Sequence, residues 1–439
     1  MSCVEVSFLT KDKREFKKRI TAFFSVFLCL LLVGCQTSVV GQKEQITTES
    51  GEEKEELSDE TIKTQTDRTT LGIDRPTVSS NIAIDLQGYA PADIKYACFT
   101  GQDLQDTFSV YRQKDKQVVY QGSIQQTGEV GKAWGDFSGL TEPGSYYIQT
   151  AVIGRSYTFQ IYEDRYRTQF ETDRESWRNA APEDYYTAEE ETDYQALLIL
   201  AMLQEFYAEP EEEDLKKLQE DADYLTRYHT EQAKSSVSAS DADMAYVRAE
   251  YTYAAAMAQC YHVLKNEAGA TAYLKQAQVA YQTAARSRSR TDTMVSPEQY
   301  MAAAALFKAA GSYSYHQVIK QYEAAEDTTA GFWGDLFYLT SLQRVDTALC
   351  EQQMSRLLKE CGELSDRVLS QYAIEDRADS ITAMLKLSVA DDTLVSLEYR
   401  NACKTLLHAF YSNMEEMDCG QRSALLFIEG ELAKNEQGK

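Results

Sequence analysis

The sequence is poor in the residues that bind metals and nucleic acids. Its four histidines, at positions 229, 262, 316 and 408, are scattered, whereas a metal site needs converging ligands. The cysteines form no CxxC pair and no Cys/His cluster of zinc-site spacing. No block of Lys and Arg lies beyond the N-terminal segment, and the formal net charge is −25. We therefore expect no metal, no cofactor and no nucleic-acid partner.

The cysteines beyond the N-terminal segment have no spacing that would pair them. Most are expected to be small buried hydrophobic residues. One or two disulfides stay open as an alternative if the protein is in an oxidising location. The cysteines concerned are Cys98, Cys260, Cys350, Cys361, Cys403 and Cys419.

The apolar run near the N-terminus is too short to span a membrane permanently. It covers residues 22–33, after a basic stretch, whereas a spanning helix needs roughly 20 apolar residues. This order is typical of a secretory signal peptide. The run ends in Leu32-Val33-Gly34-Cys35, which resembles the bacterial lipobox. We predict that residues 1–34 are a lipoprotein signal peptide and that a lipid on Cys35 anchors the chain at the extracellular face of the bacterial cell membrane. An uncleaved anchor is the alternative.

The next segment lacks the apolar side chains that a core requires. Residues 35–79 are rich in Glu, Thr, Gln, Ser and Asp, so they cannot bury enough surface to offset chain entropy. We predict a disordered acidic tether.

Two regions of different periodicity follow. In residues 80–163 short alternating apolar runs such as 108–111 and 146–148 are separated by Gly, Pro, Asp and Ser, which indicates the strands and turns of a β-sandwich. In residues 164–439 apolar residues recur at helical spacing, and about eleven helices joined by short loops indicate stacked antiparallel hairpins. A strict repeat period is missing, which disfavours a solenoid. Alternation of strands and helices is missing too, which argues against a two-lobed α/β ligand carrier.

Several short motifs occur in order along the chain. In the first region they are Asp85-Leu86-Gln87-Gly88-Tyr89 with Pro91 and Lys95, then 119–122, 134–138 and 144–147; in the helical region they are 253–260, 273–277 and 300–311. In these motifs the chain resembles family 9 glycoside hydrolases, the cellulase family in which an immunoglobulin-like module precedes a helical barrel. The resemblance implies a multidomain fold, an N-terminal immunoglobulin-like β-sandwich followed by an all-α (α/α)6-type barrel. The barrel should be trimmed, with short loops and a first helix that is short or missing.

The resemblance implies inverting chemistry, in which a carboxylate base and a carboxylic acid lie about 6.5–9.5 Å apart across the scissile bond. In the family the base lies in a Trp-x-Asp-Ala-Gly-Asp motif, and the matching segment here is 177–186. Trp177 and Tyr186 keep the register, but Asn179 and Pro182 replace both aspartates. Neither side chain can take a proton from water, and general-base assistance is worth roughly 10²–10⁴-fold.

Carboxylates at neighbouring positions could still supply the catalytic base and acid. A shift of one or two residues would bring Glu183 or Asp184 into the position of the base. In the family, the glutamate that acts as general acid follows a loop rich in Gly, Pro and His and comes shortly before the final helix. That loop is missing here. Glu416 is the nearest candidate by position, although a Glu-Glu pair at a helix end is more often simply solvated.

Two hypotheses about function follow from the resemblance. The favoured one is a cell-surface lipoprotein with an eroded active site that binds or presents β-glucan, another polysaccharide or a protein. Candidate sugar-stacking residues are Trp177, Tyr185, Tyr186 and Trp333, and ordinary packing between helices is the alternative for each. The competing hypothesis is an active inverting β-1,4-glucan hydrolase that uses Asp184 or Glu183 as base and Glu416 as acid.

Overall fold

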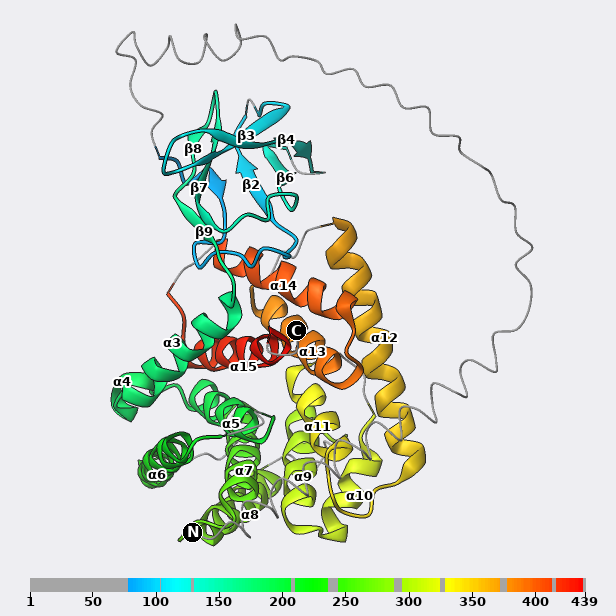
Figure 1. Cartoon of the computed structure of the whole chain (residues 1–439). Helices are drawn as coiled ribbons and strands as arrows, with labels where there is room; N and C mark the ends of the chain where they lie inside the picture. Colours follow the sequence, from blue (N-terminus) through cyan, green and yellow to red (C-terminus); the bar gives the residue numbers. More distant parts are fainter. Residues whose placement is uncertain are drawn as a thin grey trace, which may run out of the picture. The chain divides into compact units, whose positions relative to one another are not determined.

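The computed structural model describes residues 78–102, 104–127, 130–206, 210–235, 244–287, 294–323, 328–371, 377–412 and 416–436. The predicted signal peptide, the lipidation site Cys35 and nearly all of the predicted tether lie outside these residues. Within the described part a β-sandwich is followed by an all-α region, as Figure 1 shows. No helix in these ranges is long and apolar enough to cross a membrane.

The β-sandwich consists of two antiparallel sheets whose inner faces form a separate core. One strand face is buried at every second residue, as at Phe108 and Val110, which is the alternation the sequence predicts. The motif glycine Gly122 leaves room for the Phe108 ring, because a Cβ there would lie 2.5 Å from the ring atom Cε1. The first sheet has the order β1 (Ile82–Ala83), β2 (Tyr96–Thr100), β6 (Lys132–Asp136), β5 (Gln125–Gln126); the second has β4 (Val118–Ser123), β3 (Thr107–Arg112), β7 (Gly144–Thr150), β8 (Gly154–Arg155), with β9 (Phe159–Ile161) paired to β7.

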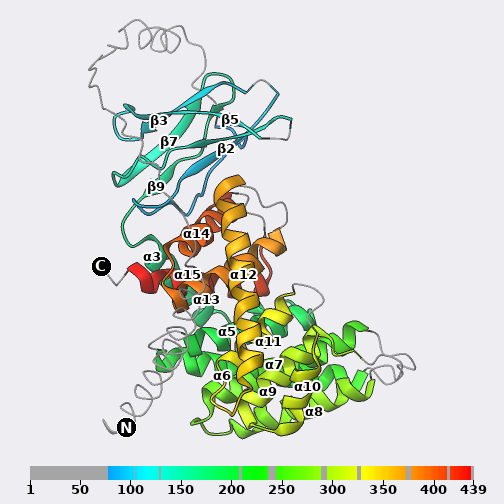
Figure 2. The same cartoon turned by 90° about the vertical axis from the view of Figure 1, so that its right-hand side faces the viewer.

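The described helices form an inner and an outer set, seen in two views in Figures 1 and 2. The inner helices are buried on nearly all sides, and the outer helices bury one face. The inner set is α5 (Glu190–Phe206), α7 (Met244–Leu264), α9 (Pro297–Ala310), α11 (Thr329–Leu339), α13 (Arg377–Leu394) and α15 (Cys419–Glu436). The outer set is α3 (Arg165–Asn179), α6 (Glu212–Ser235), α8 (Thr271–Ser287), α10 (Tyr313–Gln321), α12 (Thr347–Gln371) and α14 (Leu397–Ser412), and α4 (Pro182–Tyr185) is a single turn. This is the predicted (α/α)6-type arrangement.

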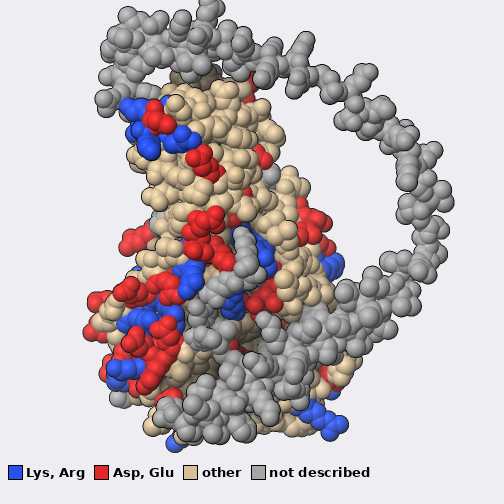
Figure 3. All heavy atoms as spheres, in the orientation of Figure 1, with Lys and Arg blue, Asp and Glu red and all other residues tan. Residues whose placement is uncertain are grey.

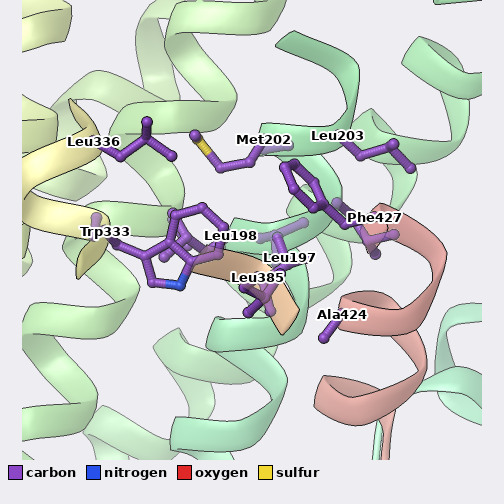
Figure 4. Close-up of a cluster of buried hydrophobic side chains, with 14 of the residues drawn as sticks. Leu197, Leu198, Met202, Leu203, Trp333, Leu336, Leu385, Ala424 and Phe427 are labelled. Carbon is purple, nitrogen blue, oxygen red and sulfur yellow. The ribbon is translucent and has the colours of Figure 1, made fainter. Parts of the chain in front are cut away.

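Apolar side chains from four inner helices fill the space between them (Figure 4). The indole of Trp333 meets the ring of Phe427 edge-on at a centroid distance of 6.0 Å. Around this pair lie Leu197, Leu198, Met202, Leu336, Leu385 and Ala424. The centre of the helical region is therefore a packed core.

The first outer helix is fully formed, contrary to the expectation that it is short or missing. Helix α3 has 15 residues, and its buried face carries Arg165 and Arg174 beside Tyr166, Phe170 and Trp177. Two charged residues on the buried face weaken the apolar periodicity, which is the signal that sequence reasoning uses.

His408 of α14 lies between two carboxylates of the β-sandwich. Its Nδ1 is 2.7 Å from Asp85 Oδ2, and its Nε2 is 3.2 Å from Asp93 Oδ2. Tyr166 donates to Asp93 Oδ2 at 2.9 Å, and Lys404 Nζ donates to Asp93 Oδ1 at 2.9 Å. Burial alone would raise the pKa of Asp93, but His408 and Lys404 hold that pKa well below its usual value.

Arg165 extends this contact to the last helix. Its guanidinium is 3.3 Å from Asp85 Oδ2 and 3.4 Å from Glu429 Oε1, and its Nε donates to the Gly88 carbonyl at 3.1 Å. Gly88 has φ +92°, and a Cβ there would lie 2.7 Å from the Gln160 carbonyl oxygen, so only glycine fits. The 85–89 motif and Asp93 thus both belong to the surface through which the sandwich contacts the helical region.

Replacing Asp93 with asparagine should lower the free energy of unfolding at pH 7 by about 3 kcal/mol, because His408 and Lys404 would lose a buried counter-ion. Folding lowers the pKa of Asp93, so its stabilisation is present above the usual carboxyl pKa of about 4 and is lost as the pH falls below it. Chemical denaturation of the wild type and of Asp93→Asn should therefore show a smaller difference in unfolding free energy at pH 3 than at pH 7. An equal difference at both pH values would contradict this assignment. Asp115→Asn, at an exposed hairpin, is the control and should change little.

Candidate functional site

The segment that follows α3 and the beginning of α15 meet at the N-terminal end of the inner helices. The hydroxyl groups of Tyr185 and Ser423 are 2.9 Å apart. The Arg422 guanidinium donates to the Tyr185 carbonyl at 2.6 Å and lies 4.8 Å from the centre of its ring. The structure therefore brings the segment that resembles the family's base motif against the helix that follows Glu416.

Asp193 of α5 holds the same region together through hydrogen bonds to Thr187 and Cys419. Its buried Oδ1 accepts hydrogen bonds from the Thr187 amide at 2.9 Å, the Thr187 hydroxyl at 3.0 Å and the Cys419 thiol at 3.2 Å. Burial and Asp193 raise the pKa of Cys419 to about 12, so this thiol stays protonated and acts as a donor.

The predicted catalytic carboxylates are all exposed in this region. Asn179 is the last residue of α3, Pro182 is the first of α4, and Glu183 and Asp184 follow in the same turn. Acidic residues at this position stabilise a helix N-terminus. Glu416 lies in the non-helical segment before α15 and is also exposed. An exposed carboxylate is hydrated and lacks the rigid surroundings that hold a catalytic group within about 0.5 Å.

The four predicted stacking residues lie inside the protein. Trp177 is 1% exposed, Trp333 is 3% exposed, and Tyr185 and Tyr186 are each 6% exposed. The structure brings Tyr185 and Tyr186 into edge-on contact at 5.3 Å, whereas Trp333 lies in the central core (Figure 4). In this structure their rings pack against protein atoms rather than solvent.

Sequence reasoning missed the partner of Trp177. The indole Nε1 donates to Asp221 Oδ2 at 2.9 Å, and Lys217 Nζ lies 2.6 Å from Asp221 Oδ1. Burial raises the pKa of Asp221 although Lys217 and Trp177 both lower it. The i,i+4 spacing of Lys217 and Asp221 on α6 predicts their ion pair, but no local pattern predicts the contact of Asp221 with Trp177.

Charged residues of both signs gather over α3, α4 and α6 (Figure 3). Arg178 of α3 lies 2.7 Å from Glu211 Oε2 and 2.6 Å from Asp214 Oδ1, and Arg174 also pairs with Asp214. These pairs fix the helix that carries Trp177 against α6.

A second polar group lies at the N-terminal ends of α5 and α7, and we call Glu190, Tyr194, His229 and Glu250 the Glu190 cluster. His229 Nε2 is 2.9 Å from Glu250 Oε1, and the imidazole stacks on the Tyr253 ring at 3.9 Å. Burial and the charge of Glu250 raise the pKa of Glu190, which His229 partly offsets. Sequence reasoning treated His229 as a scattered structural residue, since nothing in its spacing points to carboxylates on α5 and α7.

The described residues contain no metal-binding group of three or more His, Cys, Asp and Glu side chains. The six cysteines in the described ranges are all free, and five of them are buried. Disulfides, which the sequence left open, are thus not formed among these six.

An immunoglobulin-like sandwich followed by an (α/α)6-type barrel is the architecture of one class of proteins. Comparisons with known protein families and solved structures show which class it is. Residues 77–155 match the family model of the cellulase N-terminal immunoglobulin-like domain. No curated protein matches the chain in sequence.

Solved structures of family 9 glycoside hydrolases share the fold. A metagenome-derived family 9 endoglucanase is 17% identical with a TM-score of 0.56, covering 74% of this chain and 82% of its own. A family 9 protein of Bacteroides ovatus is 12% identical with a TM-score of 0.60, covering 81% and 99%. A single mutant of a thermostable endoglucanase from Alicyclobacillus acidocaldarius is 15% identical with a TM-score of 0.56, covering 76% and 82%. The chain therefore has the fold of family 9 endoglucanases with a cellulase-type N-terminal domain, and the predicted fold class is confirmed.

Replacing Asp193 with alanine should remove the acceptor of three hydrogen bonds and leave the buried Cys419 thiol without its acceptor, at a cost on the order of 3 kcal/mol in unfolding free energy. Chemical denaturation measures this loss. Asp193→Asn keeps one acceptor oxygen and should lose less, and Glu189→Ala, at an exposed residue of the same loop, should lose least. Equal effects of all three substitutions would contradict the role given to Asp193.

Proposed function

We propose that the protein is a cell-surface lipoprotein that binds a polysaccharide of the β-glucan class and does not hydrolyse it. The observation that carries this proposal is the pair Asn179 and Pro182, which stand where the resemblance to family 9 expects two aspartates. The fold of family 9 endoglucanases supports a role with glycans. The packing around Trp177 supports retention of the scaffold without its acid–base groups.

The exposed positions of Glu183, Asp184 and Glu416 support the same proposal. A general base needs a fixed position beside the attacking water, and an acid needs a fixed position beside the leaving oxygen. Charged residues on a solvated turn and in a non-helical segment meet neither need without a bound ligand that orders them.

The full-length protein in detergent should release no reducing sugar from soluble β-1,4-glucans and should bind cello-oligosaccharides in isothermal titration. Turnover that is lost in Asp184→Ala and in Glu416→Gln would support the inverting hydrolase with displaced carboxylates instead. Absence of both turnover and heat across a broad glycan panel would overturn glycan binding and favour a scaffold for proteins.

The proposed location at the extracellular face of the membrane rests on Cys35 and the apolar run before it. Labelling of growing bacterial cells with a fatty-acid analogue should mark the wild-type protein and leave Cys35→Ser unmarked, and the variant should leave the membrane fraction. Cys98→Ser is the matched control, because Cys98 lies in the β-sandwich, and it should label like the wild type. Label retained in Cys35→Ser would rule out lipidation at this residue.

A further inference from the structure

The Glu190 cluster contains two buried polar atoms without hydrogen-bond partners in the protein. They are the hydroxyl of Tyr194 and Oε2 of Glu250. Tyr194 is 1% exposed and Glu250 is 4% exposed. Burying such groups unpaired costs free energy that an apolar side chain of similar shape would not cost. The scaffold alone therefore gives no reason to keep the Tyr194 hydroxyl.

The two atoms belong to one electrostatic group. The Tyr194 ring lies 6.1 Å from the imidazole of His229. Burial raises the pKa of Tyr194, and the carboxylates of Glu190 and Glu250 raise it further. The other carboxylate oxygen of Glu250 is already held by His229 at 2.9 Å. The carboxylate is thus held through Oε1, and the Tyr246 hydroxyl also interacts with it, while Oε2 has no hydrogen-bond partner of good geometry.

The chemistry of the two atoms is complementary to an alcohol. A phenol hydroxyl can donate, and a carboxylate oxygen can only accept. A ligand hydroxyl can accept from the first and donate to the second at once, which is the pattern that a sugar ring presents repeatedly. Glu190, Tyr228, His229 and Tyr246 are only partly buried, so the cluster reaches the surface. A tyrosine combines an apolar ring with a polar hydroxyl, which suits contact with a sugar ring.

We propose that the Glu190 cluster holds a sugar ring, with one ring hydroxyl bridging the Tyr194 hydroxyl and Glu250 Oε2. This inference rests on the proposed glycan binding and deepens it. It places the ligand contact at the N-terminal ends of α5 and α7, on residues other than those that align with the family's base motif.

The decisive variant is Tyr194→Phe, because the hydroxyl can be removed without leaving a protein group unpaired. We expect the melting temperature of the full-length protein in detergent to stay equal or rise, and its affinity for cellohexaose in isothermal titration to fall about tenfold. Glu250→Gln should also weaken binding, since an amide replaces the fixed acceptor. Tyr315→Phe is the matched control, a buried tyrosine of outer helix α10, and should bind like the wild type.

Each outcome decides between the proposals. Binding by the wild type that is unchanged in Tyr194→Phe would overturn the Glu190 cluster and leave glycan binding standing. A loss of melting temperature in Tyr194→Phe would show that the hydroxyl supports the fold, which also overturns the inference. No binding by the wild type to any oligosaccharide would remove the proposed function and this inference together.

Discussion

His408 lies between the carboxylates of Asp85 and Asp93, and the helical region is joined to the β-sandwich through this contact. Arg165 links the same Asp85 to Glu429 of α15, so α3, α14 and α15 are all oriented by one buried group of charges. The far ends of α3 and α15 carry Trp177 and Ser423, which frame the candidate site. The geometry of that site is therefore set by a contact at the opposite ends of the helices that build it.

On our proposal, the segment that resembles the family's base motif has kept its packing residues and lost its aspartates. Trp177 is still held by Asp221 of α6, and Tyr185 still meets α15. Asn179 and Pro182 occupy the positions that would need ionisable groups. A buried aromatic residue contributes about 3–5 kcal/mol to the free energy of unfolding whether or not catalysis takes place nearby. The loss of acid–base groups that we propose would therefore leave the helices in place.

The sequence predicted the parts of the fold that follow from periodicity. Helix α9 begins after the Ser296 cap and ends before Gly311, whose φ is 68°. These are the bounds that the Ser-Pro and Gly signals indicate. Helix α3 was missed because its buried face contains arginines whose partners lie far along the chain. The Glu190 cluster was missed for the same reason: a histidine on α6 and carboxylates on α5 and α7 converge only after the helices pack. Burial of charge through long-range pairing leaves no local pattern in a sequence.

The inner helices bury polar side chains at both of their ends. At the C-terminal ends, Glu205 accepts hydrogen bonds from Lys308 and Gln259, each at 2.6 Å, and Lys308 also donates to Thr340. That network raises stability by pairing each charge it buries. At the N-terminal ends, Tyr194 is buried with an unpaired hydroxyl beside two carboxylates. Unpaired buried polar atoms also occur at the C-terminal ends, at Oε1 of Gln204 and Oε1 of Gln259, so an unpaired atom alone does not mark a ligand site. The two carboxylates beside the Tyr194 hydroxyl are what favour the sugar contact that we propose there.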